Sequence, residues 1–261
     1  MIFKVHRSQN NKGIDTICSL LNSMSVKNIP KNIKAIQRQL SDDFDLSKLT
    51  KCYHICGNCG TSNLHLIRRC SLCNHETILK FYSCSIIQQI QQLLSNFGMF
   101  SKLKEEKLKN IHSFSSTTYG KTLHEIEDNA FTLIINVDGV RTPNKNLSLW
   151  PFVLVFNELP IPYRRYLENI LIAGIIPTGK KPTNAVIEAC LKVIYDELIQ
   201  LEQGQEFYIS DIDQRKILHF YNIASCNDKP AEALMENVVQ YNAEYGCPKC
   251  FIKGMHIDRY H

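Results

Sequence analysis

A continuous apolar run, Phe131–Val137, restricts the fold of this chain more than any other sequence feature. It reads Phe-Thr-Leu-Ile-Ile-Asn-Val and ends at Asp138-Gly139. A run so rich in β-branched residues is typical of a strand that is buried on both faces. The sequence therefore predicts a central strand in a sheet that is covered on both sides.

The residues after 121 alternate between strand and helix patterns. Leu147–Phe156 and Asn169–Ile176 are the second and third predicted strands, and a long helix is expected from Pro182 to about Gln203. Lys216–Ser225 is a fourth predicted strand, followed by a helix at Ala231–Tyr241. Three strands, a helix, a strand and a helix predict an α/β sheet domain.

Two aspartates follow two of these strands. Asp138 comes directly after the first strand, and Asp228 comes just after the fourth. Two carboxylates held side by side at a sheet edge would form a hard-oxygen site for Mg²⁺ or Mn²⁺. The alternative is that each aspartate caps a turn or helix, and Asp228 in particular is placed to cap a helix that begins at Pro230.

Two Cys-x2-Cys pairs predict a metal site before the sheet domain. Cys56 and Cys59 form the first pair, and Cys70 and Cys73 form the second after ten intervening residues. Two residues between cysteines let both sulfurs reach one tetrahedral Zn²⁺. We therefore expect residues 51–84 to form a zinc ribbon. Four further side chains in this segment are possible replacement ligands: Cys52, His54, His75 and Cys84.

A third Cys-x2-Cys pair, Cys247 and Cys250, lies near the end of the chain. His256 and His261 follow it, and the resulting Cys-x2-Cys-x5-His-x4-His spacing is compatible with zinc. Eleven cysteines with most of them at ligand spacing favour metal binding over disulfides.

The charge of the chain is unevenly distributed. Residues 1–120 carry 16 Lys/Arg and 7 Asp/Glu, a net charge of +9, whereas residues 121–261 carry 14 and 18, a net charge of −4. A basic first half suits contact with phosphates, and a solvated basic surface is the other interpretation. Arg68 and Arg69 lie in the expected ribbon. They could likewise contact phosphates or simply be solvated surface residues.

Residues 1–50 are polar and predict a peripheral arm, and residues 85–120 predict a helical linker that contains the apolar pattern of Ile86–Phe100. No apolar stretch reaches 18 residues, so no membrane span is expected. The N-terminus lacks the apolar run of a signal peptide.

Several short motifs together resemble one family. They are Asn136-Val-Asp-Gly-Val140, Ser148-Leu-Trp-Pro-Phe152, Asn157-Glu-Leu-Pro160, Ala173-Gly174, Asp228-Lys-Pro-Ala231 and Gly246-Cys-Pro-Lys-Cys250. In order and spacing they resemble the transposase-domain proteins of animal genomes related to CACTA (En/Spm-like) DNA transposons. The resemblance covers roughly residues 50–261.

The resemblance implies an RNase H-like mixed sheet with flanking helices, which is the catalytic core of DDE-type transposases. Asp138 matches the first catalytic aspartate of the family, and Asp228 matches the second. Cys247 and Cys250 match a Cys-x2-Cys motif that follows the second aspartate. The implied cofactors are catalytic Mg²⁺ or Mn²⁺ beside structural Zn²⁺. The implied partners are transposon-end DNA and a second copy of the chain, in the nucleus.

The chain departs from the family at the third acidic residue, which is expected after a long insertion. The sequence ends at His261 before such a segment, and Glu232, Glu236 and Glu244 follow Asp228 too closely to take its place. We therefore expect residues 121–261 to be an incomplete core that does not cut DNA alone. The alternative is a non-catalytic, zinc-stabilised DNA-binding or interaction protein derived from a transposon.

Overall fold

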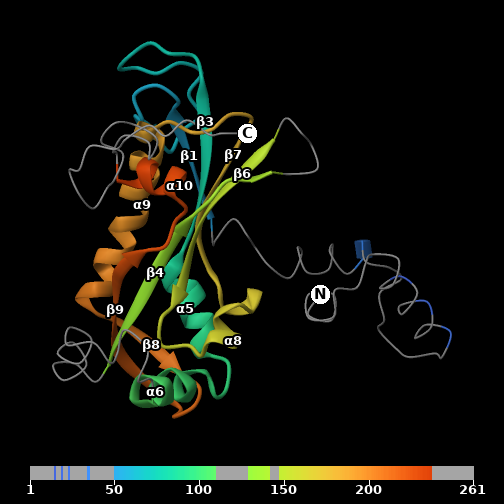
Figure 1. Ribbon diagram of the computed structural model, residues 1–261, viewed down its shortest axis with the longest axis vertical. Helices are drawn as coiled ribbons and strands as arrows, with labels where there is room; N and C mark the ends of the chain where they lie inside the picture. The colour runs from blue at the N-terminus through green and yellow to red at the C-terminus, as the bar shows by residue number, and fades with distance from the viewer. Residues whose placement is uncertain are drawn as a thin grey trace, which may run out of the picture. The chain divides into compact units, whose positions relative to one another are not determined.

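The computed structural model describes residues 50–109, 129–141 and 147–236, with a few single positions before residue 50 (Figure 1). Residues 51–261 form one compact unit, and residues 1–50 form another. Apart from these single positions, the predicted N-terminal arm lies outside the described residues.

Four strands form the centre of the sheet. β4 (Ala130–Val137), β6 (Ser148–Phe156) and β7 (Leu171–Thr178) pair antiparallel in that order. β9 (Gln214–Ser225) lies on the other side of β4 and runs parallel to it. These are the four strands that the sequence predicts, and β4 is buried along most of its length as its apolar run requires.

Five shorter strands extend the sheet. β8 (Gln205–Ile209) forms a hairpin with β9, and β5 (Val140–Arg141) pairs with β6. At the opposite edge, β3 (Ile78–Cys84) pairs antiparallel with β7, followed by β1 (Thr50–Cys56) and β2 (Ser62–Asn63). The described residues thus form a mixed α/β fold around one nine-stranded sheet with the order β2-β1-β3-β7-β6-β4-β9-β8.

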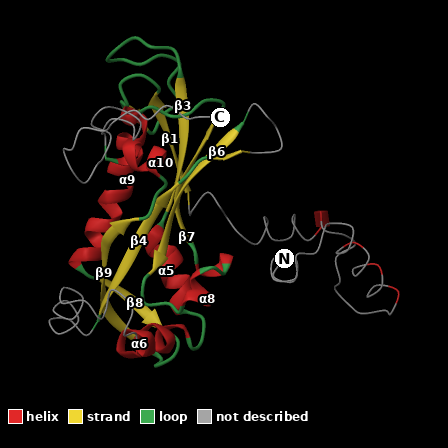
Figure 2. Ribbon diagram, viewed as in Figure 1, coloured by secondary structure: helices red, strands yellow, loops and turns green. Residues whose placement is uncertain are grey.

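The long helix α9 (Asn184–Gln203) runs along one side of the sheet and packs mainly on β9 (Figure 2). The Thr183 side chain accepts a hydrogen bond from the Val186 NH at its start, and Gly204, with φ of 100°, ends it. Three shorter helical segments are α8 (Ile161–Arg164), a 3₁₀ turn at Leu167–Asn169 and α10 (Lys229–Met235). No helix among the described residues is both long and apolar enough to cross a membrane.

Helices α5 (Ile86–Leu94) and α6 (Met99–Lys109) occupy the segment predicted to be a linker. They belong to the core instead, because their apolar side chains join the same buried cluster as β4 and β9: Ile86, Ile90, Leu93, Leu94, Met99, Phe100 and Leu103. The buried cluster that these helices and strands share contains many aromatic side chains. Phe131 of β4, for example, stacks on Phe220 of β9 with ring centroids 5.6 Å apart.

Two glutamines of α5 bond to the backbone of two strands. The Gln89 side-chain amide donates to the Ile172 carbonyl and accepts from the Ile172 NH, both at 2.9 Å. The Gln91 amide forms the same pair of bonds with Tyr208 of β8, both at 3.0 Å. Helix α5 therefore satisfies backbone groups of β7 and of β8, which lie far apart in the strand order.

Candidate functional site

Four segments meet at one edge of the sheet because of the strand directions. β4 ends at this edge, β6 begins there because it is antiparallel to β4, and β7 ends there because it is antiparallel to β6. β9 also ends there, since it is parallel to β4. Residues after β4, β7 and β9, and those at the start of β6, are thereby brought together.

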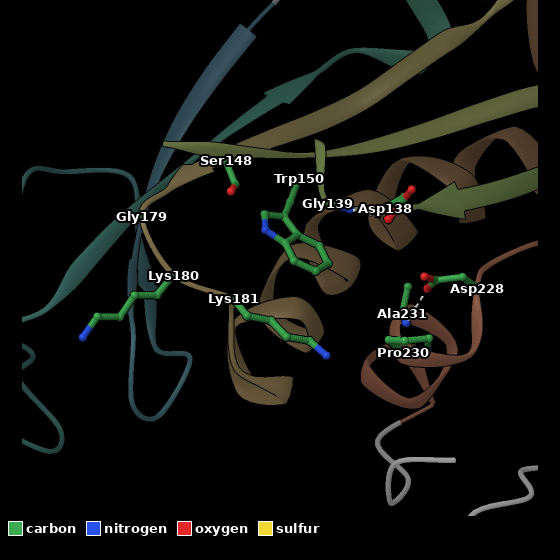
Figure 3. Close-up of a pocket in the computed structure, with 10 residues that line it drawn as sticks. All are labelled: Asp138, Gly139, Ser148, Trp150, Gly179, Lys180, Lys181, Asp228, Pro230 and Ala231. Atoms are coloured by element: carbon green, nitrogen blue, oxygen red, sulfur yellow. Dashed lines mark hydrogen bonds between the residues drawn. The ribbon is translucent and has the colours of Figure 1, made fainter. Parts of the chain in front are cut away.

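A cavity of about 290 Å³ lies at this edge. Figure 3 shows that Asp138 and Asp228 project into the same space, from the segments that follow β4 and β9. The remaining lining residues are Gly139, Ser148, Trp150, Gly179, Lys180, Lys181, Pro230 and Ala231. The cavity therefore holds two carboxylates and two lysines.

The segments that carry the two aspartates are joined by hydrogen bonds. The Asn227 side-chain oxygen accepts from the Val137 NH at 2.7 Å, and the Cys226 NH donates to the Ile135 carbonyl at 2.9 Å. The Asn136 amide also donates to the Cys226 carbonyl. These three bonds, two of them from asparagine side chains, extend the pairing of β4 and β9 up to the aspartates and hold the two segments side by side.

Each aspartate uses one carboxylate oxygen locally. Asp138 Oδ1 accepts from the Gly139 NH at 2.6 Å, and Asp228 Oδ1 accepts from the Ala231 NH at 2.8 Å. Asp228 is thus the N-cap of α10, as its position before Pro230 suggested. Both side chains are exposed to solvent. Capping engages Oδ1 and leaves Oδ2 available to a cation, so the two interpretations of Asp228 are compatible.

Trp150 forms a wall of the cavity and explains the glycine beside Asp138. A Cβ atom at Gly139 would lie 2.8 Å from a ring carbon of the indole, so the ring packs against a backbone that carries no side chain. The indole Nε1–H is buried and has no hydrogen-bond partner among the described residues. An unpaired donor of this kind costs roughly 1–3 kcal/mol unless a water or a ligand satisfies it.

Lys180 and Lys181 are the site residues that sequence reasoning missed. Their glycine-lysine context lacks the spacing of a phosphate loop, and for that reason the sequence gives no motif that marks them. Pairing of Ser148 with Thr178 places the residues that follow β7 beside the start of β6. Only the sheet topology reveals that these lysines share a cavity with the aspartates.

The four predicted ribbon cysteines come together in a second site. The sulfur atoms of Cys56, Cys59, Cys70 and Cys73 all lie within 4.8 Å of one another. Two of the Sγ–Sγ distances, Cys56 to Cys73 and Cys59 to Cys70, are 3.5 Å. Tetrahedral Zn²⁺ with bonds of about 2.3 Å separates its sulfurs by about 3.8 Å, so the four thiols could hold a metal ion such as zinc.

Each of the two cysteine pairs lies on its own turn, and the two turns are of the same type. The Gly60 NH donates to the Cys56 carbonyl, and the Asn74 NH donates to the Cys70 carbonyl, each at 3.0 Å. The residue after the second cysteine of each pair has a left-handed backbone, with φ of 72° at Gly60 and 59° at Asn74. Glycine and asparagine are the residues that adopt this conformation most readily.

Hydrogen bonds in these turns favour the thiolate, which is the metal-binding form of cysteine. The Thr61 hydroxyl lies 3.1 Å from Cys59 Sγ, and hydrogen bonds from Thr61 lower the pKa of Cys59 to about 6. Backbone hydrogen bonds from Cys73 and Leu72 lower the pKa of Cys70. Burial raises the pKa of Cys56 to about 11.

The first cysteine turn packs on the start of α9. The Thr183 hydroxyl donates to the Gly57 carbonyl at 3.2 Å, and a Cβ atom at Gly60 would lie 2.3 Å from the Ala185 carbonyl oxygen. Thr183 follows Lys181 by two residues. The cysteine cluster therefore packs against the segment that carries Lys180 and Lys181, which together form the lysine wall of the cavity.

A family described as a protein of unknown function (DUF1258) matches residues 46–255, which is most of the chain. The chain belongs to this family. No curated protein matches the chain. The matched region of this family member contains both the cavity and the cysteine cluster.

Other predicted ligands of this family member are not part of either site as described. Cys247, Cys250, His256 and His261 lie outside the described residues. Among the described residues, the four-cysteine group does not include Cys52, His54, His75 or Cys84. Glu232 and Glu236 lie on α10 or at its end and do not line the cavity.

Proposed function

We propose that this chain carries the carboxylate pair of a DDE-type DNA transposase, in an RNase H-like core preceded by a zinc ribbon. One observation carries the proposal: Asp138 and Asp228, which the resemblance to CACTA-like transposases assigns as catalytic aspartates, line one cavity. They reach it from the ends of β4 and β9, which are parallel neighbours.

The strand order gives independent support. The chain leaves β4 on one side for β6 and β7, and it returns on the other side at β9. Such a reversal of strand order is the place where α/β sheets bind ligands, outside the carboxyl ends of the strands.

The chemistry of the cavity suits a divalent cation. Asp138 and Asp228 each keep an oxygen free of the local bonds described above, and carboxylate oxygens are the preferred ligands of Mg²⁺ and Mn²⁺. A cation held there would polarise a phosphodiester and assist an attacking water or 3′-hydroxyl. The cavity as described supplies two carboxylates, so binding of a second cation needs a further ligand.

Manganese binding tests this proposal. We expect free Mn²⁺, followed by electron paramagnetic resonance, to be depleted by the zinc-loaded wild-type protein and not by Asp138→Asn or Asp228→Asn. The second substitution keeps an oxygen that accepts from the Ala231 NH, so it removes the charge and retains the cap. Asp196→Asn, at an exposed position of α9, is the matched control. Unchanged Mn²⁺ binding in the two cavity variants would reject the catalytic assignment.

A non-catalytic, zinc-stabilised DNA-binding role is the second candidate. The observation that favours it is that the described residues bring two carboxylates to the cavity, where the DDE-type transposases that the chain resembles use three. It predicts salt-dependent DNA binding that survives loss of both aspartates and disappears when zinc is removed. DNA binding that is absent at low salt would reject this candidate.

A further inference from the structure

The lysine wall of the cavity has no role in the proposed cation site. Lys180 and Lys181 are exposed, follow β7 and lie across the cavity from the aspartates. The ion pairs of Arg69 with Glu76 and of Arg215 with Glu206 do not involve these lysines. Figure 3 shows the Lys181 ammonium directed toward Asp228 and Pro230, and the Lys180 ammonium directed away from them.

The charges of the cavity change when a cation binds. Two aspartates and two lysines sum to zero, and one divalent cation makes the sum +2. A positive cavity in which a lysine faces a metal is suited to an anion that bridges the two, and a phosphate diester has this charge and size.

We propose that Lys181, with Trp150 beside it, forms a phosphate-binding subsite that holds a nucleic-acid phosphodiester against the cation at Asp138 and Asp228. The inference rests on the proposed function for the cation and for the choice of nucleic acid. The lysine subsite itself depends on neither aspartate. Lys181 contributes a charged donor to the phosphate, and Lys180 contributes mainly to the surrounding potential.

Trp150 is the single tryptophan of the chain, so its fluorescence reports on this cavity alone. The probes are a two-nucleotide DNA fragment with one phosphodiester and inorganic phosphate, each titrated at constant ionic strength with and without Mn²⁺. We expect a saturable fluorescence change with the DNA fragment, and tighter binding when Mn²⁺ is present, because the two ligands bind the cavity with positive coupling.

Substitution of Lys181 tests the subsite directly. Lys181→Gln is expected to raise the Kd of the DNA fragment at least about tenfold, since it removes a charge-assisted hydrogen bond. Lys181→Arg is expected to retain binding, and Lys180→Gln is expected to have a smaller effect. Lys192→Gln, an exposed position on α9, controls for the loss of one charge elsewhere. Equal Kd values for Lys181→Gln and Lys192→Gln would overturn the proposal.

The aspartate variants separate this inference from the proposed function. In Asp138→Asn combined with Asp228→Asn, we expect the DNA fragment to bind without Mn²⁺ at least as tightly as in the wild type, because two repelling charges are gone. A wild-type protein that binds Mn²⁺ but shows no response to the fragment would remove the subsite and leave the cation site. Inorganic phosphate that binds as tightly as the fragment would identify a free-phosphate site and overturn the nucleic-acid assignment.

Discussion

The cysteine cluster and the carboxylate cavity are both candidate metal sites, and they are built in opposite ways. The cluster takes four ligands from one short segment, residues 56–73, and each pair lies on a turn with its own hydrogen bonds. The cavity takes two carboxylates from segments about ninety residues apart, and its position depends on the pairing of β4 with β9. A complete local ligand set should bind its metal far more tightly than an incomplete, exposed one.

The first prediction tests this difference where the expected effect is largest. Cys59→Ser combined with Cys70→Ser removes one sulfur from each turn, and we expect this variant to bind no zinc. Metal binding contributes to folding, so the free energy of unfolding should fall by roughly 4 kcal/mol or more. Zinc content by mass spectrometry and unfolding in urea measure the two effects. Cys226→Ser, at an exposed cysteine, should change neither.

A glycine pair tests whether the cluster is held to the sheet domain through α9. Gly60→Ala should lower the free energy of unfolding by about 3 kcal/mol or more, because it adds a clash with the Ala185 carbonyl to the cost of a positive φ. Gly98→Ala is the matched control, since Gly98 has φ of 84° and open space around it. That variant should lose only about 1 kcal/mol. Equal losses in the two variants would show that the contact between the cluster and α9 contributes nothing.

Asp211, which is not part of the cavity, is an aspartate with a purely structural role. Asp211 accepts from the Gly98 NH at 2.6 Å and the Ser101 NH at 2.7 Å, and it thereby caps α6 from the turn between β8 and β9. Burial acts to raise the pKa of Asp211, but the hydrogen bonds from Ser101 and Gly98 outweigh it and the pKa is lowered.

Acid unfolding checks this assignment and should give the smallest effect. A lowered folded-state pKa adds stability above the unfolded value of about 3.9, and this stability is lost as the pH falls through the folded value. Asp211→Ala should cost about 1 kcal/mol at neutral pH, with a smaller difference from wild type below about pH 4. Asp196→Ala on the surface of α9 should show no such pH-dependent difference. A constant difference at all pH values would contradict the capping role.

Sequence patterns predicted the parts of this structure that depend on local chemistry. The apolar run before Asp138 became β4, the proline- and glycine-bounded segment became α9, and the cysteine spacing brought four sulfurs together. In each case the residues that determine the feature are close in sequence, so periodicity or spacing contains the information.

Features that depend on distant pairing were not predictable in the same way. Residues 85–120 were expected to link two domains, but the Gln89 and Gln91 amides bond to strands more than eighty residues away. Pairing of β3 with β7 likewise joins the cysteine segment to the main sheet, where the sequence suggested separate domains. Lys181 reaches the cavity only because β7 ends beside β6, and no local pattern records that register.

The central claim is that Asp138 and Asp228 share one cation, and cleavage of the backbone by bound iron tests it most directly. Fe²⁺ occupies Mg²⁺ sites, and with ascorbate and peroxide it cuts the chain beside its ligands, which mass spectrometry of the zinc-loaded protein can locate. We predict cuts near both 138 and 228, suppressed by Mn²⁺, and loss of both cuts in either Asp138→Asn or Asp228→Asn. Cleavage at only one position, or cuts at one aspartate that persist when the other is replaced, would contradict the account.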